Sequence, residues 1–323
     1  MDNLTHSLAG ALLGQMGLKR ASRFAMAGCI LGANAPDIDV FAPFFLPVDN
    51  IAFHRGPTHA LFGLPVMAAG TVALLWLVDR LRSAKPGTPP FRAWPLFLVT
   101  LLAVISHPFL DWLTTYAVAF FAPLGDRWYS ANAIFIIDWV YWIILGLGIW
   151  LSARKWKRGE EHPGRPAQIA GGILFTYIAL NIAWSAFAEA RLATALRLRG
   201  IEPRLIVASP PPFFFWQRGL AWRSDTEWGG GSFSPGNGLR VDPKARPLGL
   251  DDPRFLRARA TSRQVRSFLY WSRMPIVVEE GGRAILTDQR YYRALDDQRV
   301  PVAIRNRAPR GQFQIPLDLP SKP

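Results

Sequence analysis

The chain has 323 residues, half of them apolar, and its 37 Lys and Arg outnumber its 23 Asp and Glu. Most of the apolar residues lie before position 190, in several runs that approach the roughly 20 residues needed to cross a bilayer. Soluble domains rarely carry several such runs, so this composition argues against an ordinary soluble protein. The single cysteine, Cys29, excludes both an intramolecular disulfide and a zinc site built from cysteines.

The apolar segments predict the order of the membrane helices. Two short segments, 4–18 and 24–35, predict a helical hairpin that is shorter than a full span and is buried among longer helices. Four longer segments follow and predict spans, and these are expected at 58–80, 93–121, 133–152 and 167–190.

Basic residues cluster in every second connection between these segments, at 19–23, 80–92 and 154–165. The positive-inside rule places these three connections in the cytoplasm. Connections 36–57 and 122–132, and everything after about residue 190, are then expected outside the cytoplasm. Asp79 stands next to Arg80 in the sequence, and the two are expected to form an ion pair at the membrane interface.

After residue 200 the pattern changes to short β-prone runs separated by Gly and Pro, expected at 204–208, 213–216, 275–278 and 313–317. Residues 262–272 predict an amphipathic helix, and residues 280–282, Glu-Gly-Gly, predict a hairpin turn. The three glycines at 229–231 predict a flexible stretch, and the C-terminal end is expected to be flexible as well.

These patterns together predict an α-helical integral membrane protein with four long spans, a short N-terminal helical hairpin and a small C-terminal α+β domain. The expected boundary lies between residues 1–190 and residues 191–323. The first part carries 14 Lys and Arg against 11 Asp and Glu, whereas the second carries 23 against 12. Beside a membrane, such a basic domain is expected near anionic lipid headgroups rather than on nucleic acid, the alternative being a merely solvated Arg-rich surface.

Four of the five histidines lie before residue 108, each beside a polar neighbour. The expected topology places them on the outer side together with several aspartates, and imidazole and carboxylate groups suit zinc, manganese or iron. The sequence therefore predicts a divalent metal site, with zinc as the first expectation. The candidate ligands are His6, Asp37, Asp39, His54, His59, His107, Asp111 and Asp138.

Each candidate also has a structural alternative. A lone membrane histidine such as His6 is often a packing residue, Asp37 and Asp39 could cap a helix or form an Asx turn, and Asp138 could pair with Arg127. The set is too large for one tetrahedral site. It could fill two metal sites, or one site with a general base and an orienting shell.

Three residues carry predicted catalytic roles. Asp39 or Asp111 is expected to act as general base toward water activated by the metal. Arg55, between two candidate ligands, is expected to bind an anionic substrate group, and the alternative is a structural arginine that snorkels to the interface.

A short internal echo links two of the histidines, because residues 5–10, Thr-His-Ser-Leu-Ala-Gly, resemble residues 58–63, Thr-His-Ala-Leu-Phe-Gly. In both, a Thr-His pair opens an apolar helix, and Gly10 or Gly63 would permit close packing. The echo predicts equivalent ligand positions at two helix starts.

Taken in order, these strings resemble the YdjM-like family of LexA-regulated, inner-membrane, metal-dependent hydrolases. The resemblance covers roughly residues 1–150, through Thr-His, Pro-Asp-x-Asp, His-Arg-Gly-x-Thr-His and Ser-His-x-x-x-Asp followed by Thr-Thr-Tyr. It implies a membrane-bound metal-dependent hydrolase in the bacterial inner membrane, with the candidate ligands other than Asp138 at matching positions. The chain departs from the usual pattern at Ala60, Ala117 and Trp139, where a small hydroxyl residue, Gly and Pro are common.

The expected function is hydrolysis of a phosphoester or ester of lipid or envelope origin, with membrane lipids as partners and no nucleic acid. The expected location is the inner membrane, with the site and the C-terminal domain on the extracytoplasmic side. A metal-ion or proton-coupled transporter is one alternative, because buried His and Asp also mark ion pathways. A non-catalytic membrane scaffold with a structural metal is the other.

Overall fold

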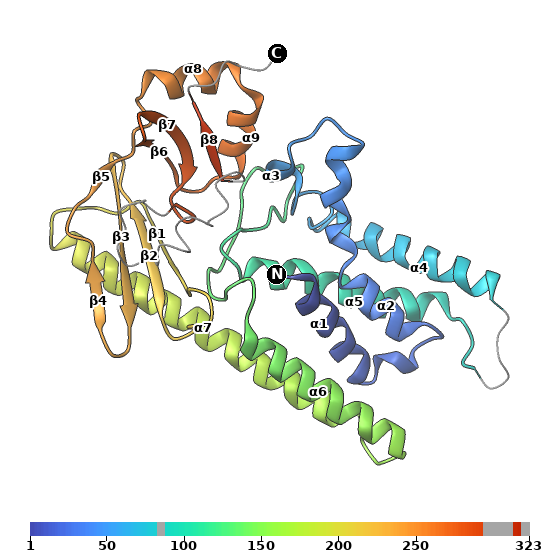
Figure 1. The fold of residues 1–323 in the computed structure, drawn as a ribbon. Coiled ribbons are helices and arrows are strands. Elements are labelled where there is room, and N and C mark those ends of the chain that lie inside the picture. The colour runs from blue at the N-terminus through green and yellow to red at the C-terminus, as the bar shows by residue number, and fades with distance from the viewer. Residues whose placement is uncertain (83–87, 293–312, 318–323) are drawn as a thin grey trace. The chain divides into compact units, whose positions relative to one another are not determined.

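The computed structural model describes residues 1–82, 88–292 and 313–317. This part of the chain forms two compact units (Figure 1). Unit 1 contains residues 1–184 and 209–215, and unit 2 contains residues 185–208 and the described residues from 216 onward.

Unit 1 is helical (Figure 1). Its elements are α1 (Asn3–Gln15), η1 (Leu18–Arg20), α2 (Ala25–Gly32), η2 (Ala35–Phe44), α3 (Asn50–Phe53), α4 (Gly63–Leu81), α5 (Ala93–Trp112), α6 (Trp139–Arg158) and the first part of α7 (Arg165–Arg197). The predicted N-terminal hairpin is present as α1 and α2. Gly10 lets these helices touch, because a Cβ added there would lie 2.4 Å from the carbonyl oxygen of Cys29.

Three of these helices, α4, α5 and α7, are long and apolar enough to cross a membrane. The predicted membrane character is therefore confirmed, whereas the count of four spans is not. Helix α6 differs because Arg154, Lys155, Lys157 and Arg158 lie in its last turns and shorten its apolar stretch. Helix α5 ends at Trp112, before the predicted end at 121, and the chain then continues without regular helix as far as Asp138.

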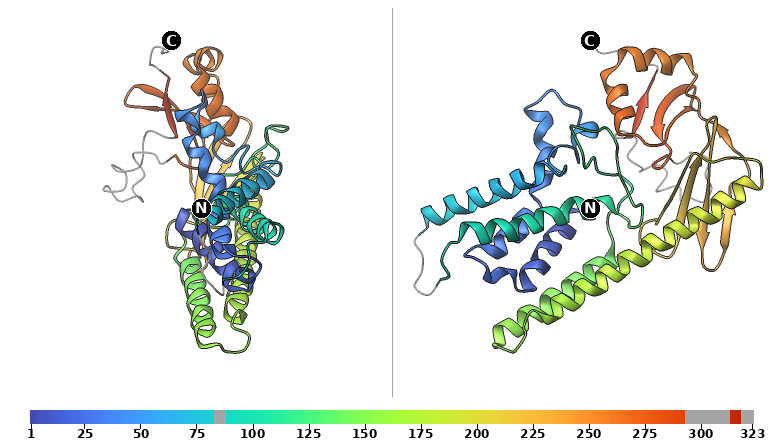
Figure 2. Two further views of the ribbon diagram at one scale, coloured as in Figure 1. Left: turned by 90° about the vertical axis from the view of Figure 1, so that its right-hand side faces the viewer. Right: turned by 180° about the vertical axis from the view of Figure 1, so that it is seen from behind.

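Helix α1 lies against α2, α5 and α6. Leu12 of α1 packs in one apolar core with Tyr141 and Leu145 of α6 and Leu174 of α7. Helix α6 and the first part of α7 run side by side in every view (Figure 2), and the backbone N–H of Ala167 donates to Ser152 Oγ at 2.9 Å where the chain reverses. These contacts hold α1 in place, and α1 carries His6.

Unit 2 combines two β-sheets with two short helices. Strands β1 to β4 lie in the order 1-2-3-4 with β5 paired to β3, and β6, β7 and β8 form the second sheet in that order. The strands are β1 (Leu205–Ser209), β2 (Arg218–Arg223), β3 (Glu227–Ser234), β4 (Gly238–Val241), β5 (Arg246–Pro247), β6 (Pro275–Glu280), β7 (Arg283–Asp288) and β8 (Gln314–Pro316), and the helices are α8 (Pro253–Thr261) and α9 (Arg263–Trp271). The predicted mixture of helix and strand is present in this region.

The local predictions in unit 2 have different outcomes. The amphipathic helix is confirmed as α9, which begins where Ser262 Oγ accepts the N–H of Val265, and the hairpin turn is confirmed by positive φ at Gly281 and Gly282. The flexible glycine stretch is wrong, because residues 229–231 lie inside β3 and pair with β2. Gly229 is needed there because a Cβ would lie 2.7 Å from Trp222.

Two further predictions concern residues 213–216 and the C-terminal end of the chain. The strand predicted at 213–216 is wrong, since these residues form a turn with Phe213 at φ 67°. The carbonyl oxygen of Phe213 accepts a hydrogen bond from Trp139 Nε1 at 3.1 Å, so its partner is a side chain and not a neighbouring strand. The flexible end predicted for the chain lies outside the described residues from 318 onward.

Asp288 should be the most sensitive position in unit 2. Its buried carboxylate accepts hydrogen bonds from Arg290 Nε at 2.8 Å and from Ser272 Oγ at 2.6 Å. Burial by itself would raise the pKa of this carboxyl, but Arg290 and the hydrogen bond from Ser272 together outweigh burial and lower it. We expect Asp288→Asn to reduce the free energy of unfolding of unit 2 by about 3–5 kcal/mol, because Arg290 is left buried without its counterion.

Denaturant titration of the detergent-purified chain, followed by limited proteolysis of unit 2, measures this effect. Asp225→Asn is the matched control, because Asp225 pairs with Arg204 where both side chains are 69% exposed. The control should unfold at the wild-type midpoint. Equal midpoints for the two variants would contradict a stabilising role for the Asp288 pair.

Candidate metal centre

Four segments of unit 1 bring the predicted histidines and aspartates together. Helix α1 carries His6, and its start is fixed where Asp2 accepts the N–H of Thr5 at 3.0 Å. Helix η2 carries Asp37 and Asp39, and the loop after α3 carries His54 and His59. Helix α5 carries His107 and Asp111, four residues apart on one face.

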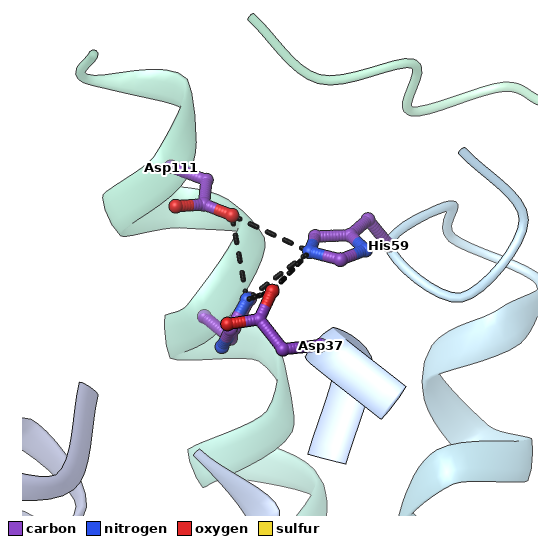
Figure 3. Close-up of side chains that lie close together, drawn as sticks. Asp37, His59 and Asp111 are labelled. Atoms are coloured by element: carbon purple, nitrogen blue, oxygen red, sulfur yellow. Dashed lines mark hydrogen bonds and ion pairs between the residues drawn. The ribbon is translucent and has the colours of Figure 1, made fainter. Parts of the chain in front are cut away.

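Four side chains converge most closely: Asp37, His59, His107 and Asp111, called here the four-residue cluster. His107 Nε2 lies 3.1 Å from His59 Nε2, 3.2 Å from Asp37 Oδ1 and 3.3 Å from Asp111 Oδ2. His59 Nε2 lies 3.3 Å from the same Asp111 oxygen. Figure 3 shows Asp37, His59 and Asp111 pointing toward one position.

The partners of the other ring nitrogens show which atoms face this position. His107 Nδ1 lies 2.6 Å from the carbonyl oxygen of Ala33, which can only accept, so Nδ1 carries the proton and Nε2 presents a lone pair. His59 Nδ1 lies 3.0 Å from Thr58 Oγ1 and 3.3 Å from Asp39 Oδ2, which favours the same tautomer. Two imidazole lone pairs and two carboxylate oxygens therefore face one another. They repel unless a cation lies among them.

His6 lies at the edge of this cluster. Its ring stacks on His107 with centroids 3.7 Å apart, and its Nε2 is 3.4 Å from Asp111 Oδ1. Neither ring nitrogen of His6 has a hydrogen-bond partner among the described residues, although both are buried. The α-amino group of Met1 also contacts Asp111 Oδ1. Buried nitrogen atoms without partners are costly in a protein, which fits a place for a cation.

A second group consists of Asp37, Asp39 and His54. Asp39 Oδ1 lies 2.7 Å from His54 Nδ1, and its Oδ2 accepts from the N–H of Arg55 at 3.1 Å and from Thr58 Oγ1 at 2.6 Å. Asp39 thus orients both His54 and His59. Asp37 belongs to both groups, so its carboxylate lies where the two candidate cation positions meet.

Asp37 and Asp39 lie in η2, outside the candidate spans. Burial by itself would raise the pKa of each carboxyl. At Asp39 the rings of His54 and His59, which face it through Nδ1, outweigh burial and hold the pKa well below its usual value. Asp39 is therefore a carboxylate at neutral pH, the form in which aspartate binds metals.

Arg55 lies beside the four-residue cluster and does not snorkel to an interface. It is buried, with 4% of its surface exposed, and its Nη2 lies 3.0 Å from Asp111 Oδ1. Its Nη1 donates to Thr114 Oγ1 at 3.1 Å, and its guanidinium lies 4.8 Å from the ring centre of Tyr116. The arginine therefore holds Asp111, a member of the four-residue cluster, in position.

Asp138 is the predicted ligand that the structure does not bring to the others. It caps α6, where its Oδ1 accepts the N–H of Val140 at 2.9 Å, and its Oδ2 accepts from Tyr177 at 2.9 Å. These partners use both oxygens, which corrects the assignment of Asp138 to the metal site. The predicted alternative, a pair with Arg127, is not formed among the described residues either, since Arg127 lies over the ring of Tyr129.

Sequence reasoning did not assign roles to Thr58, Thr114 or the carbonyl of Ala33. Thr58 and Thr114 both lie within the sequence motifs that carry the family resemblance, so their place in those motifs is the sequence signal that points to them. Ala117, where the family pattern favours Gly, has φ 80°, a left-handed conformation that Gly adopts without cost. Gly63 of the echo permits a close approach as predicted, since a Cβ there would lie 2.1 Å from the carbonyl oxygen of Pro57.

The model of the YdjM inner membrane protein family matches residues 1–188, more than half of the chain. The chain belongs to this family. It is also 28% identical over 162 residues to uncharacterized protein YfhP of Bacillus subtilis (strain 168), a match that covers 47% of this chain and 47% of YfhP. The chain thus spans about half the length of this curated relative. No solved structure gives a significant match. All residues of both groups lie within the matched YdjM region, whereas residues 189–323 lie beyond it.

Proposed function

We propose that the chain is a membrane-bound metal-dependent hydrolase. The supporting observation is the convergence of two imidazole nitrogens and two carboxylate oxygens within 4.8 Å of one another, with the tautomers set so that lone pairs face inward. This donor set suits zinc, with manganese or iron as further candidates. His59, His107, Asp37 and Asp111 would hold one ion, and Asp37, Asp39 and His54 would hold a second.

A divalent ion supplies Lewis-acid chemistry, because it polarises an ester or phosphoester oxygen and lowers the pKa of water. The protein side chains would position that chemistry. Asp39 accepts from His54, Arg55 and Thr58, which makes it a positioning residue. Asp111 Oδ2 accepts no hydrogen bond among the described residues and faces His59 and His107, so this oxygen would bind the metal rather than act as the general base.

The proposed substrate is a phosphoester or ester that carries an apolar tail. Support comes from η2, because this helix carries Asp37 and Asp39 and also exposes large apolar side chains. Phe41 and Phe44 of η2 are 55% and 80% exposed, and Phe45 directly after it is 84% exposed. An apolar surface beside ionised carboxylates suits a lipid of the membrane or envelope better than a small hydrophilic ester.

The test is metal analysis and a hydrolysis screen on the chain purified in neutral detergent. The substrates are bis(p-nitrophenyl) phosphate, p-nitrophenyl esters of increasing acyl length, and phospholipids. We expect metal-dependent turnover that chelation abolishes and that His107→Ala lowers by at least about a hundredfold, because the cluster loses one of its ligands.

Asp126→Ala is the matched control, because Asp126 is an exposed unit 1 aspartate outside both groups. It should retain wild-type metal and turnover. Bound metal without turnover on any substrate class would reject the hydrolase and favour a structural metal. Metal flux into liposomes without turnover would favour the transporter.

A further inference from the structure

A second site lies at the end of α1 opposite the metal centre. A cavity of about 360 Å³ opens there, lined among others by Met16, Arg20, Trp156, His162, Arg165 and Gln168. Met16 lies ten residues after His6, so the helix separates the cavity from the metal cluster by roughly 15 Å. The two sites share no lining residue.

The chemistry of the lining is cationic. Arg20 and Arg165 contribute two guanidinium groups, and neither forms an ion pair with a carboxylate among the described residues. The nearby Glu160 is already paired with Lys155 at 2.9 Å and with Arg158 at 3.5 Å, and it does not line the cavity. Two cations without counterions beside one opening favour an anionic ligand.

The cationic wall is held in place by Trp156. The guanidinium of Arg20 lies 4.3 Å from the centre of its ring, and Lys19 Nζ lies 4.1 Å from it. Lys19 in turn donates to Gln15 Oε1 at 2.8 Å. Arg20 is therefore oriented before any ligand binds, which lowers the entropic cost of binding.

The opposite wall is held by contacts between α1 and the start of α7. Gln168 Nε2 donates to the carbonyl oxygen of Met16 at 3.1 Å. Gly164 lies directly on the same carbonyl, because a Cβ added there would lie 2.8 Å from it. The cavity therefore lies where the end of α1 contacts the start of α7.

The place of the cavity along the chain indicates the source of the anion. Arg165 is the first residue of α7, one of the helices long and apolar enough to cross a membrane. The end of a span lies at the depth of the lipid headgroups, where tryptophan is also common. We propose that this cavity binds the phosphate group of an anionic phospholipid, with Arg20 and Arg165 as its charged contacts.

The test uses the full chain purified in neutral detergent and titrated by calorimetry with dihexanoyl phosphatidylglycerol, dihexanoyl phosphatidylcholine or inorganic phosphate. We expect phosphatidylglycerol to bind most tightly. The double variant Arg20→Gln, Arg165→Gln should bind it at least about tenfold more weakly, since the phosphate loses both of its charge-assisted contacts. Its metal content should equal that of wild type, which verifies the fold independently of the lipid site.

The control variant Arg154→Gln, Lys157→Gln removes the same charge from the end of α6 without touching the cavity lining. It should keep wild-type affinity, and an equal loss in both variants would overturn the proposal in favour of non-specific attraction. Equal binding of phosphatidylcholine would overturn the charge selectivity. Inorganic phosphate binding as tightly as the lipid would overturn the lipid assignment. If the glutamine variant does not fold, Arg20→Lys, Arg165→Lys tests the same contacts with the charge retained, and unchanged binding there would overturn the assignment of the two guanidinium groups as the phosphate contacts.

Discussion

Replacing Asp37 by Asn should remove metal from both groups at once. Asp37 belongs to the four-residue cluster and to the group with Asp39 and His54, so its carboxylate is the one ligand that both positions share. We expect wild type to bind two ions per chain and Asp37→Asn to lose most of both, because a neutral amide is a much weaker ligand than a carboxylate. Inductively coupled plasma mass spectrometry on the detergent-purified chain measures the stoichiometry.

His54→Ala provides the contrast. His54 belongs to the second group alone, so this variant should lose one ion and keep the other. If His54→Ala kept the full wild-type metal content, the second group would be an orienting shell rather than a metal site. If Asp37→Asn kept wild-type metal, the shared position would be contradicted. Asp126→Asn, outside both groups, should change neither count.

Replacing Arg55 by Lys should weaken metal binding by about 10- to 100-fold, the usual effect of disturbing a group that orients a ligand. Arg55 reaches Asp111 Oδ1 at 3.0 Å with one nitrogen and Thr114 Oγ1 at 3.1 Å with another. A lysine keeps the charge but has a single nitrogen, so it cannot hold both partners in this geometry. The measurement is a zinc titration of the metal-stripped chain by calorimetry.

Arg127→Lys is the matched control, because Arg127 lies over the ring of Tyr129 at 5.2 Å and contacts no member of the metal groups. It should bind zinc as wild type does. Thr114→Val removes the second partner of Arg55 and also the hydrogen bond that Thr114 Oγ1 donates to the carbonyl oxygen of Asp111 at 2.8 Å. It leaves the contact between Arg55 and Asp111 in place, so we expect the same direction of change with a smaller magnitude. Unchanged zinc affinity in Arg55→Lys would show that the pair with Asp111 stabilises the fold without orienting a ligand.

Several features followed from the sequence because they depend on residues close together in the chain. The helical hairpin at the N-terminus, helix α9 and the Gly281-Gly282 turn rest on local periodicity and turn chemistry. The spacing of His107 and Asp111 placed both on one helix face, because a helix returns to the same side every 3.6 residues. The choice of imidazole and carboxylate as ligand types also needed no tertiary structure.

The identity of the partners depended on tertiary packing. Asp79 was expected to pair with its neighbour Arg80, but its Oδ1 lies 2.6 Å from Nη1 of Arg23. The packing of the segment that carries Arg23 brings this arginine to Asp79. Arg55 turned inward to Asp111, a residue 56 positions away in the sequence, for the same reason. Charge pattern alone treats all nearby opposite charges as equal, whereas the folded backbone decides which side chain reaches which.

The sharing of Asp37 between two groups was also beyond the sequence. The order Pro-Asp-x-Asp shows two carboxylates but does not say which of them faces α5. In the structure Asp37 Oδ1 faces His107 of α5, while Asp39 faces His54 and Thr58 of the loop after α3. That division follows from the 3-10 conformation of η2, in which alternate residues point in different directions and three residues complete a turn. The types of the candidate ligands were therefore determined by the sequence itself, and their division between two candidate positions by the packing of η2 between α5 and the His54–His59 loop.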